Sequence, residues 1–242
     1  MARTLKRSLI TNQYSSMKYL KTLFLGILAG AAIGLGSFLF LLAKFLLPSK
    51  EGLMFASMIF SVGLLTVCIF GLNLYTGKIG VFLDVREKIK ENSINLPIIL
   101  LGNAIGAFGL GIICHFIFMN WADFANSFSG VNSITDAKCN SDTVFMQGIL
   151  CGALVYIAVY CYKNFENWAM KIIGIIASVT LFVYCGFQHC IANMFYFAFE
   201  FKWGINVLWN LLIVILTNSI GALLVRCLVH LAAIIAPKKE EK

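Results

Sequence analysis

The chain has 242 residues, of which 60% are hydrophobic and 12% are charged, and its formal net charge is +8. No soluble domain of this length has such a composition, so the sequence is that of an integral membrane protein. The positive charge does not indicate nucleic-acid binding, because the basic residues lie beside the ends of apolar runs rather than on a soluble face.

Six apolar runs are long enough to cross a bilayer. They cover residues 20–47, 53–82, 94–119, 144–162, 168–200 and 204–236. Segment 1–18, which precedes the first run, is expected to lie as a basic helix on the membrane surface. The sequence therefore predicts an all-α protein in which residues 1–242 form one transmembrane domain with six spans.

The distribution of lysine and arginine predicts how these spans are oriented. With both termini on the inner side, that side holds 14 basic residues. The outer side then holds four, namely Lys44, Lys50, Lys138 and Lys202. We therefore expect a multi-pass protein of the inner, cytoplasmic cell membrane with both termini in the cytoplasm.

Two of the runs contain polar interruptions. The second run is broken at 71–78 (Gly-Leu-Asn-Leu-Tyr-Thr-Gly-Lys) and the fifth at 186–194 (Gly-Phe-Gln-His-Cys-Ile-Ala-Asn-Met). Irregular backbone at membrane depth is tolerated only where it is buried in protein or lines a cavity. Two broken spans of this kind predict a transport site near the middle of the membrane.

The two halves of the chain also resemble each other. Residues 26–31 (Gly-Ile-Leu-Ala-Gly-Ala) match 148–153 at an offset of 122, and 103–107 (Asn-Ala-Ile-Gly-Ala) match 218–222 at an offset of 115. The two interruptions are about 113 residues apart. Each unit has three spans, so the second copy is inverted. The sequence predicts an inverted three-helix repeat over residues 20–119 and 144–236.

His189 is the main candidate for a functional side chain. An ionisable group at membrane depth is costly and usually faces a pathway or the interior of the bundle. The alternative is a neutral histidine that is hydrogen-bonded in the core. Thr76, in the other interruption, can donate to an anion or to His189, and it can also cap the half-helix that follows. Lys78 is expected to extend to the inner interface.

Several apolar residues flank these polar positions. Packing in the core is the default interpretation of each, and in a pore they would form dry constrictions. They are Phe60, Leu64, Leu74, Tyr75, Val155 and Phe182. The eight cysteines show no metal-ligand spacing. We expect no metal, no cofactor and no enzymatic activity.

Several of these motifs occur in the order typical of one family. They are Gly-Ile-Leu-Ala-Gly at 26–30, Leu-Tyr-Thr-Gly at 74–77, Gly-Phe-Gln-His at 186–189 and Ala-Asn-Met at 192–194. Over nearly its whole length the chain resembles the formate–nitrite transporter family. The resemblance implies an aquaporin-like protomer, a homopentamer in the membrane lipid, and one pore per protomer for small monovalent anions of weak acids.

The resemblance also assigns residues to the pore. It implies that His189 is the central histidine, that Thr76 is the loop threonine, and that Lys138 is the vestibule lysine. It places Asn193 beside the substrate and assigns the slit to the six apolar residues named above.

The chain departs from the family at two carboxylates, which are replaced by Asn73 and Gln188. The Asn-Leu-Tyr-Thr-Gly form is similar to the hydrosulfide-channel branch. We therefore expect a hydrosulfide channel, with formate or nitrite as the alternative substrates.

Two alternatives come from other classes. One is a membrane redox protein that uses a histidine as a haem ligand, and the other is a neutral-solute channel of the aquaporin type. A single histidine near the membrane midplane argues against the first. The absence of a twin asparagine motif argues against the second.

Overall fold

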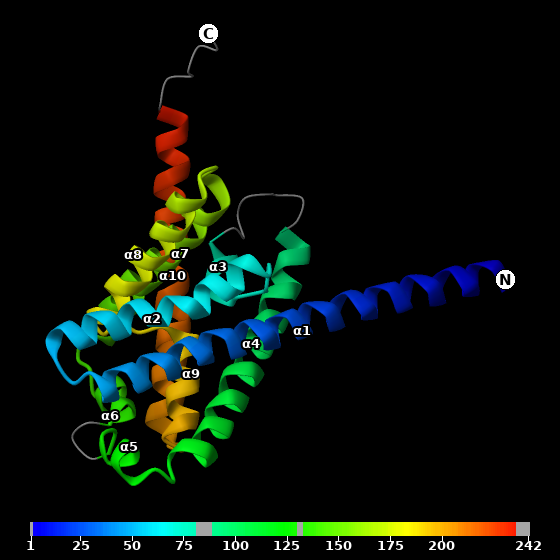
Figure 1. Cartoon of the computed structure of the whole chain (residues 1–242). Coiled ribbons are helices and arrows are strands. Elements are labelled where there is room, and N and C mark those ends of the chain that lie inside the picture. Colours follow the sequence, from blue (N-terminus) through cyan, green and yellow to red (C-terminus); the bar gives the residue numbers. More distant parts are fainter. Residues whose placement is uncertain (1, 81–88, 130–132, 236–242) are drawn as a thin grey trace.

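The computed structural model describes residues 2–80, 89–129 and 133–235, which are helical apart from short connections (Figure 1). In chain order the helices are α1 (Ala2–Leu46), α2 (Lys50–Ile69), α3 (Tyr75–Ile79), α4 (Ile89–Phe118), α5 (Ala122–Asn126), α6 (Ile134–Cys139), α7 (Val144–Asn164), α8 (Trp168–Tyr184), α9 (Cys190–Phe199) and α10 (Ile205–Ile235). Within these ranges, α1, α2, α4, α7 and α10 are long and apolar enough to cross a membrane, and α8 and α9 are shorter apolar helices. The predicted all-α membrane fold is confirmed.

The second and fifth predicted spans are each divided into two helices. The helix before each break ends at a glycine in the left-handed conformation, with φ of 62° at Gly71 and 70° at Gly186. The N–H of the next residue, Leu72 or Phe187, then bonds at 2.9 Å to the carbonyl five residues earlier. Glycine adopts this conformation without steric cost. Two helices therefore stop inside apolar sequence without a proline.

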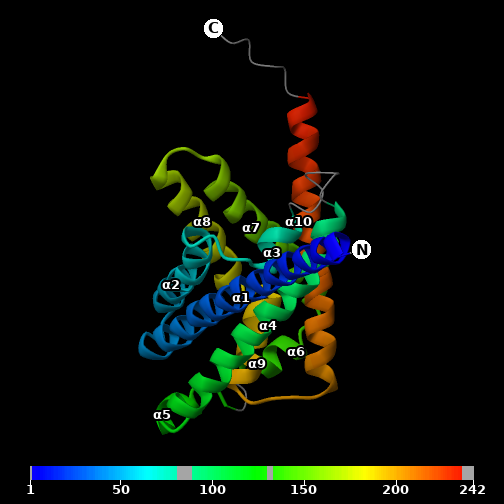
Figure 2. The same ribbon diagram turned by 90° about the vertical axis from the view of Figure 1, so that its right-hand side faces the viewer.

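The two halves of the molecule have the same arrangement of helices. In the first half α1 packs on α2 and α4, and in the second half α7 packs on α8 and α10. The short helices cross over: α9 lies against α1 and α4, and α3 lies against α7 and α10 (Figures 1 and 2). The inverted repeat with two broken spans is confirmed, and its boundaries at 20–119 and 144–236 stay predictions.

Glycines allow the long helices of each half to approach closely. A Cβ on Gly30 of α1 would overlap the main chain of Asn103 on α4, and a Cβ on Gly152 of α7 would overlap that of Asn218 on α10. Small residues at helix contacts are a general device of membrane proteins. Here they bring two asparagines of α4 and α10 within reach of the interruptions.

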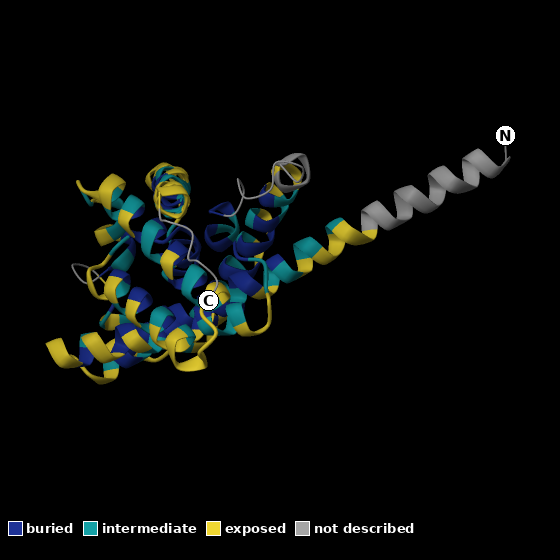
Figure 3. Ribbon diagram, turned by 90° about the horizontal axis from the view of Figure 1, so that it is seen from above, coloured by how far each residue is buried: buried dark blue, intermediate teal, exposed yellow. Residues whose placement is uncertain are grey.

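The first part of α1 extends well beyond the body of the protein (Figure 1). Segment 1–18 belongs to this helix apart from Met1, and its position on the membrane surface stays a prediction. Exposed positions run along the outward faces of the helices (Figure 3), and they include large apolar side chains such as Phe24, Leu101 and Leu208. Of the basic residues counted for the orientation, Arg86, Lys88 and those after residue 235 lie outside the described ranges.

Candidate functional site

Asn103 of α4 holds the first interruption. Its side-chain oxygen accepts a hydrogen bond from the N–H of Tyr75 at 2.8 Å. Its side-chain nitrogen donates to the carbonyls of Gly26 and Asn73, both at 2.8 Å. The first turn of α3 and the irregular segment before it are therefore tied to α1 and α4.

Asn218 of α10 holds the second interruption in the same way. It accepts from the N–H of Cys190 at 3.0 Å and donates to the carbonyls of Gly148 at 2.9 Å and Gln188 at 2.8 Å. Every partner corresponds to one in the first half, at an offset of 115 or 122 residues. The main-chain groups that the breaks expose are thus satisfied by protein, as the interior of a membrane requires.

The two interruptions meet at Thr76 and His189. Oγ1 of Thr76 lies 3.1 Å from Nε2 of His189, and both side chains are buried. Nδ1 of His189 accepts a hydrogen bond from the N–H of Ala192 at 3.2 Å and so caps α9. Since Nδ1 is an acceptor, the neutral ring carries its hydrogen on Nε2, which donates to Thr76. The predicted proximity of the two residues is confirmed, and their role in transport stays a prediction.

Aromatic rings cover the imidazole. Phe182 stacks on His189 with ring centroids 5.9 Å apart and planes at 22°, and Phe60 meets Phe182 edge-on at 5.8 Å. Three further candidates for the constriction are buried beside them, namely Leu64, Leu74 and Val155. The sixth, Tyr75, is only partly buried, and its hydroxyl lies 3.0 Å from Oγ of Ser219 on α10.

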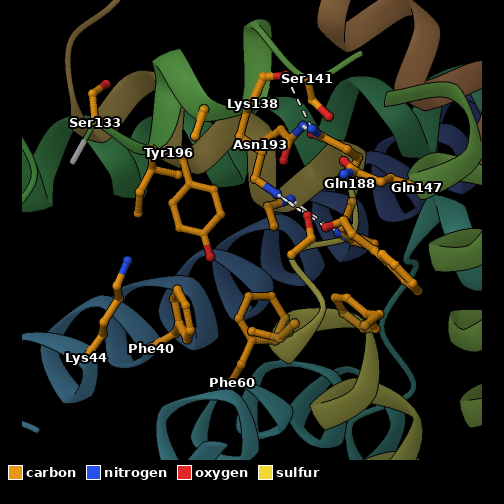
Figure 4. A pocket seen from close by; sticks show the side chains of 18 residues that line it. Phe40, Lys44, Phe60, Ser133, Lys138, Ser141, Gln147, Gln188, Asn193 and Tyr196 are labelled. Carbon is orange, nitrogen blue, oxygen red and sulfur yellow. Dashed lines mark hydrogen bonds between the residues drawn. The ribbon is translucent and has the colours of Figure 1, made fainter. Parts of the chain in front are cut away.

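A cavity of about 340 Å³ reaches His189 from the side of α6, and Figure 4 shows its lining. We call it the α6 cavity. The predicted site residues that line it are His189, Asn193, Lys138, Phe60 and Phe182.

Lys138 is fixed at the wall of the α6 cavity. Its ammonium donates to the carbonyls of Gly186 at 3.4 Å and Phe187 at 3.2 Å. Its own carbonyl accepts from the side-chain nitrogens of Gln188 at 3.3 Å and Asn210 at 3.0 Å. Burial lowers the pKa of Lys138 to about 8. Its charge therefore depends on pH just above neutrality.

Asn193 completes this amide network. Its side-chain nitrogen donates to the side-chain oxygens of Gln188 at 2.7 Å and Asn210 at 2.9 Å. Its own oxygen is buried and has no partner in the part of the chain that the structure describes. A buried acceptor without a partner is costly, so this oxygen would accept from a water molecule or a protonated acid in the cavity.

Four residues that build or support the α6 cavity were not predicted as site residues. Lys44 and Tyr196 line it, and Asn210 supports Lys138. Glu200 caps α6 by accepting from Oγ of Ser133 at 2.7 Å and from the N–H groups of residues 134 and 135 at 2.8 and 3.0 Å. Lys44 alone carried a signal, as one of the few basic residues on the predicted outer side.

A second cavity, of about 120 Å³, is lined by Leu74, Gly77 and Lys78. We call it the α3 cavity. The two cavities lie at opposite ends of α7, because Gln147 lines the α6 cavity and Lys163 lines the α3 cavity. Lys78 lies in the cavity wall, and its extension to the inner interface stays a prediction. Thr76, Leu64, Val155 and Tyr75 line neither cavity.

These features define a class of protein. Two inverted three-span repeats whose broken spans meet between two cavities form the architecture of a membrane channel or transporter. The family model described as Formate/nitrite transporter matches residues 8–236. The chain belongs to the formate/nitrite transporter family, as its motifs predicted.

Individual relatives agree with this assignment. The uncharacterised transporter YrhG of Bacillus subtilis is 31% identical over 215 residues, which cover 82% of this chain and 79% of YrhG. The nitrite transporter NirC of Escherichia coli K12 is 32% identical over 184 residues, which cover 71% of this chain and 65% of NirC.

A solved pentameric formate channel with formate bound has the same fold, with a TM-score of 0.78 at 23% identity over 91% of this chain and 99% of that one. The family and its structural neighbours are transporters and channels, not enzymes. A haem ligand is also a poor interpretation of His189, because both of its ring nitrogens have hydrogen-bond partners.

Proposed function

We propose that the chain is a channel for small monovalent anions of weak acids, with the Thr76–His189 pair at its narrowest point. The observation that carries the proposal is the hydrogen bond between the two interruptions, which lies between two cavities at opposite ends of α7. The substrates named for NirC and for the solved formate channel belong to this class of anion.

The constriction sets the selectivity. A bare charge pays several kcal/mol in a low-dielectric slit even after relaxation, and Phe60, Phe182 and Leu74 offer it no polar partner. A weak-acid anion that gains a proton in the α6 cavity crosses as a neutral molecule, and it donates or accepts at Thr76 and His189 on the way. Chloride and sulfate do not have this route.

Hydrosulfide is the substrate that we propose. The two positions where the family carries carboxylates are Asn73 and Gln188. Both are neutral amides whose side-chain nitrogens donate to main-chain carbonyls, Asn73 to Thr22 at 3.5 Å and Gln188 to Lys138 at 3.3 Å. A smaller, softer anion needs fewer hydrogen-bond donors than formate and passes a narrower slit. Formate and nitrite are the alternatives within the family.

We further propose a homopentamer in the cytoplasmic membrane with both termini in the cytoplasm. The assembly follows the solved pentameric formate channel, and the apolar outward faces of the helices can serve lipid or neighbouring subunits. The orientation follows from the distribution of basic residues. A reporter fused after Lys242 should be active on the cytoplasmic side, and activity only on the outer side would reverse the topology.

Flux into liposomes tests the function directly. Hydrosulfide, formate, nitrite and chloride are compared side by side between pH 6 and pH 8. We expect flux of the weak acids to rise as pH falls, chloride to be slow at every pH, and hydrosulfide to exceed formate. Chloride flux equal to that of hydrosulfide would refute the constriction, and formate flux well above hydrosulfide would refute the choice of substrate.

His189→Asn tests the central donor, because it keeps a donor but removes titration. We expect lower flux and an altered pH profile. His115→Asn is the matched control, since His115 bonds to the carbonyl of Phe199 at 2.7 Å and lines neither cavity. An unchanged rate and pH profile in His189→Asn would remove the role assigned to His189.

A further inference from the structure

The two cavities are equivalent by the internal repeat. Several positions that line the α3 cavity correspond, at an offset of 115 residues, to positions that line the α6 cavity. Examples are Leu74 and His189, Gly77 and Ala192, and Lys78 and Asn193. The position that carries the amide of Asn193 beside the first cavity therefore carries the ammonium of Lys78 beside the second.

Two lysines line the α3 cavity. Lys163 stands exposed among its lining residues, and Lys78 lies half-buried beside Leu74 and Gly77. Both lysines share the wall of this cavity with Cys68. None of the acidic residues that the structure describes lines this cavity. Two cations in one small space repel each other unless an anion lies between them.

We infer that the α3 cavity binds one small monovalent anion between the ammonium groups of Lys78 and Lys163. The inference rests on the proposed function, and it gives the path a second anion site beyond the constriction. The volume suits the ligand: about 120 Å³ holds a few molecules of the size of water, each of about 30 Å³. A formate-sized anion with one or two waters would fill it.

The simpler interpretation is that each lysine only stabilises the end of its helix. Lys78 and Lys163 are in the last turns of α3 and α7, where a cation is favoured by the free carbonyls. That role requires no anion and does not depend on the other lysine. The two interpretations differ in what happens to an anion that enters the cavity.

Cys68 is a natural probe for this difference, because it is partly exposed and lines the cavity. The background variant replaces with alanine the other thiols that are not buried, namely Cys139, Cys161, Cys185 and Cys227. The rate of Cys68 modification is measured in purified protein with a negatively charged and a positively charged methanethiosulfonate of similar size. It is then measured again with added sodium formate, with sodium sulfate of equal ionic strength as the salt control.

We expect the negatively charged reagent to react faster, and formate at ten times its dissociation constant to slow the reaction about tenfold. Lys78→Met with Lys163→Met should lower the ratio of the two rates about tenfold and abolish the protection. The single variants should each have part of this effect. Lys171→Met is the matched control, because Lys171 lies over the rings of Tyr162 and Trp168 and not in the cavity lining.

The inference is overturned if Cys68 does not react, if formate does not protect it, or if Lys171→Met lowers the ratio as much as the double variant. Modification does not require permeation, so failures of the two proposals are distinguishable. Protection of Cys68 in a protein that carries neither hydrosulfide, formate nor nitrite across liposomes would retain the site and refute the channel. Normal flux without protection of Cys68 would retain the channel and refute the site.

Discussion

The interruption before α3 and the interruption before α9 are built on the same scaffold. Each follows a helix that ends at a left-handed glycine, Gly71 or Gly186, and each is held by one buried asparagine that makes three hydrogen bonds. Close helix contacts at Gly30 and Gly152 bring those asparagines into place.

The two interruptions differ in the side chains that they carry at corresponding positions. The first carries Leu74, Thr76 and Lys78 at the positions where the second carries His189, Ile191 and Asn193. The shared scaffold determines where the backbone opens in the middle of the protein. The departures from symmetry determine which chemical groups lie at the contact between the interruptions and in the cavity walls, so selectivity is expected to depend on them.

The largest expected effect is on stability, from Asn103→Ala or Asn218→Ala. Each substitution removes three hydrogen bonds and leaves a main-chain N–H and two carbonyls unpaired in a buried site. An unsatisfied buried group costs about 1–3 kcal/mol, so each variant should lose more than about 3 kcal/mol. Thermal unfolding in detergent measures the loss as a lower Tm.

Asn164→Ala is the control for this pair, because Asn164 makes an exposed hydrogen bond to the carbonyl of Tyr160 near the end of α7. It should change Tm little. The comparison between the interruptions breaks down if Asn103→Ala and Asn218→Ala differ from each other by more than either differs from the control.

The sequence predicted the scaffold better than the cavities. The apolar runs, the two interruptions and the repeated Asn-x-Ile-Gly-Ala motif determine the fold, because membrane depth allows so few backbone arrangements. The contact of Thr76 with His189 followed from the repeat alone. The roles of Glu200 and Asn210 did not, because they depend on how the segment between the repeats folds back. The part of Lys78 in a cavity wall did not follow either, because the direction of a long side chain depends on packing and not on its sequence position.

Alanine substitutions at the close contacts should have the second-largest effect. A Cβ at Gly30 or Gly152 overlaps the main chain of Asn103 or Asn218, which cannot move without disturbing the interruption. Overpacking of this kind costs about 1–3 kcal/mol. Gly109→Ala is the matched control, since a Cβ there meets nothing within 4 Å, and it should be neutral or gain up to about 1 kcal/mol from helix propensity. Equal Tm values for all three variants would show that the contacts are not tight.

The pH dependence of flux tests whether the charge of Lys138 attracts the anion into the α6 cavity. Because burial lowers its pKa to about 8, Lys138 is charged at pH 7 and mostly neutral at pH 9. At low anion concentration the ratio of parent flux to Lys138→Met flux should be a few-fold at pH 7, since a local cation raises the anion concentration, and should approach one at pH 9. Lys202→Met is the control, because Lys202 lies outside the cavity lining. A ratio that does not change with pH would mean that the charge of Lys138 does not attract the anion.

The smallest effect is expected from Asp136→Asn on α6, in the segment between the two repeats. Asp136 and Lys202 form a salt bridge at 2.7 Å, but their side chains are 50% and 43% exposed. The hydrogen bond from Lys202 lowers the pKa of Asp136, so the pair stabilises the fold above the unfolded pKa of about 3.9 and is lost as pH falls through the lower folded value. Solvent screens such a pair, so Asp136→Asn at pH 7 should cost less than about 0.5 kcal/mol.

Glu200→Gln should cost more, because the Glu200 carboxylate accepts three hydrogen bonds at the start of α6. If Asp136→Asn lowers Tm as much as Glu200→Gln does, the salt bridge and not the buried cap holds Lys138 at its cavity.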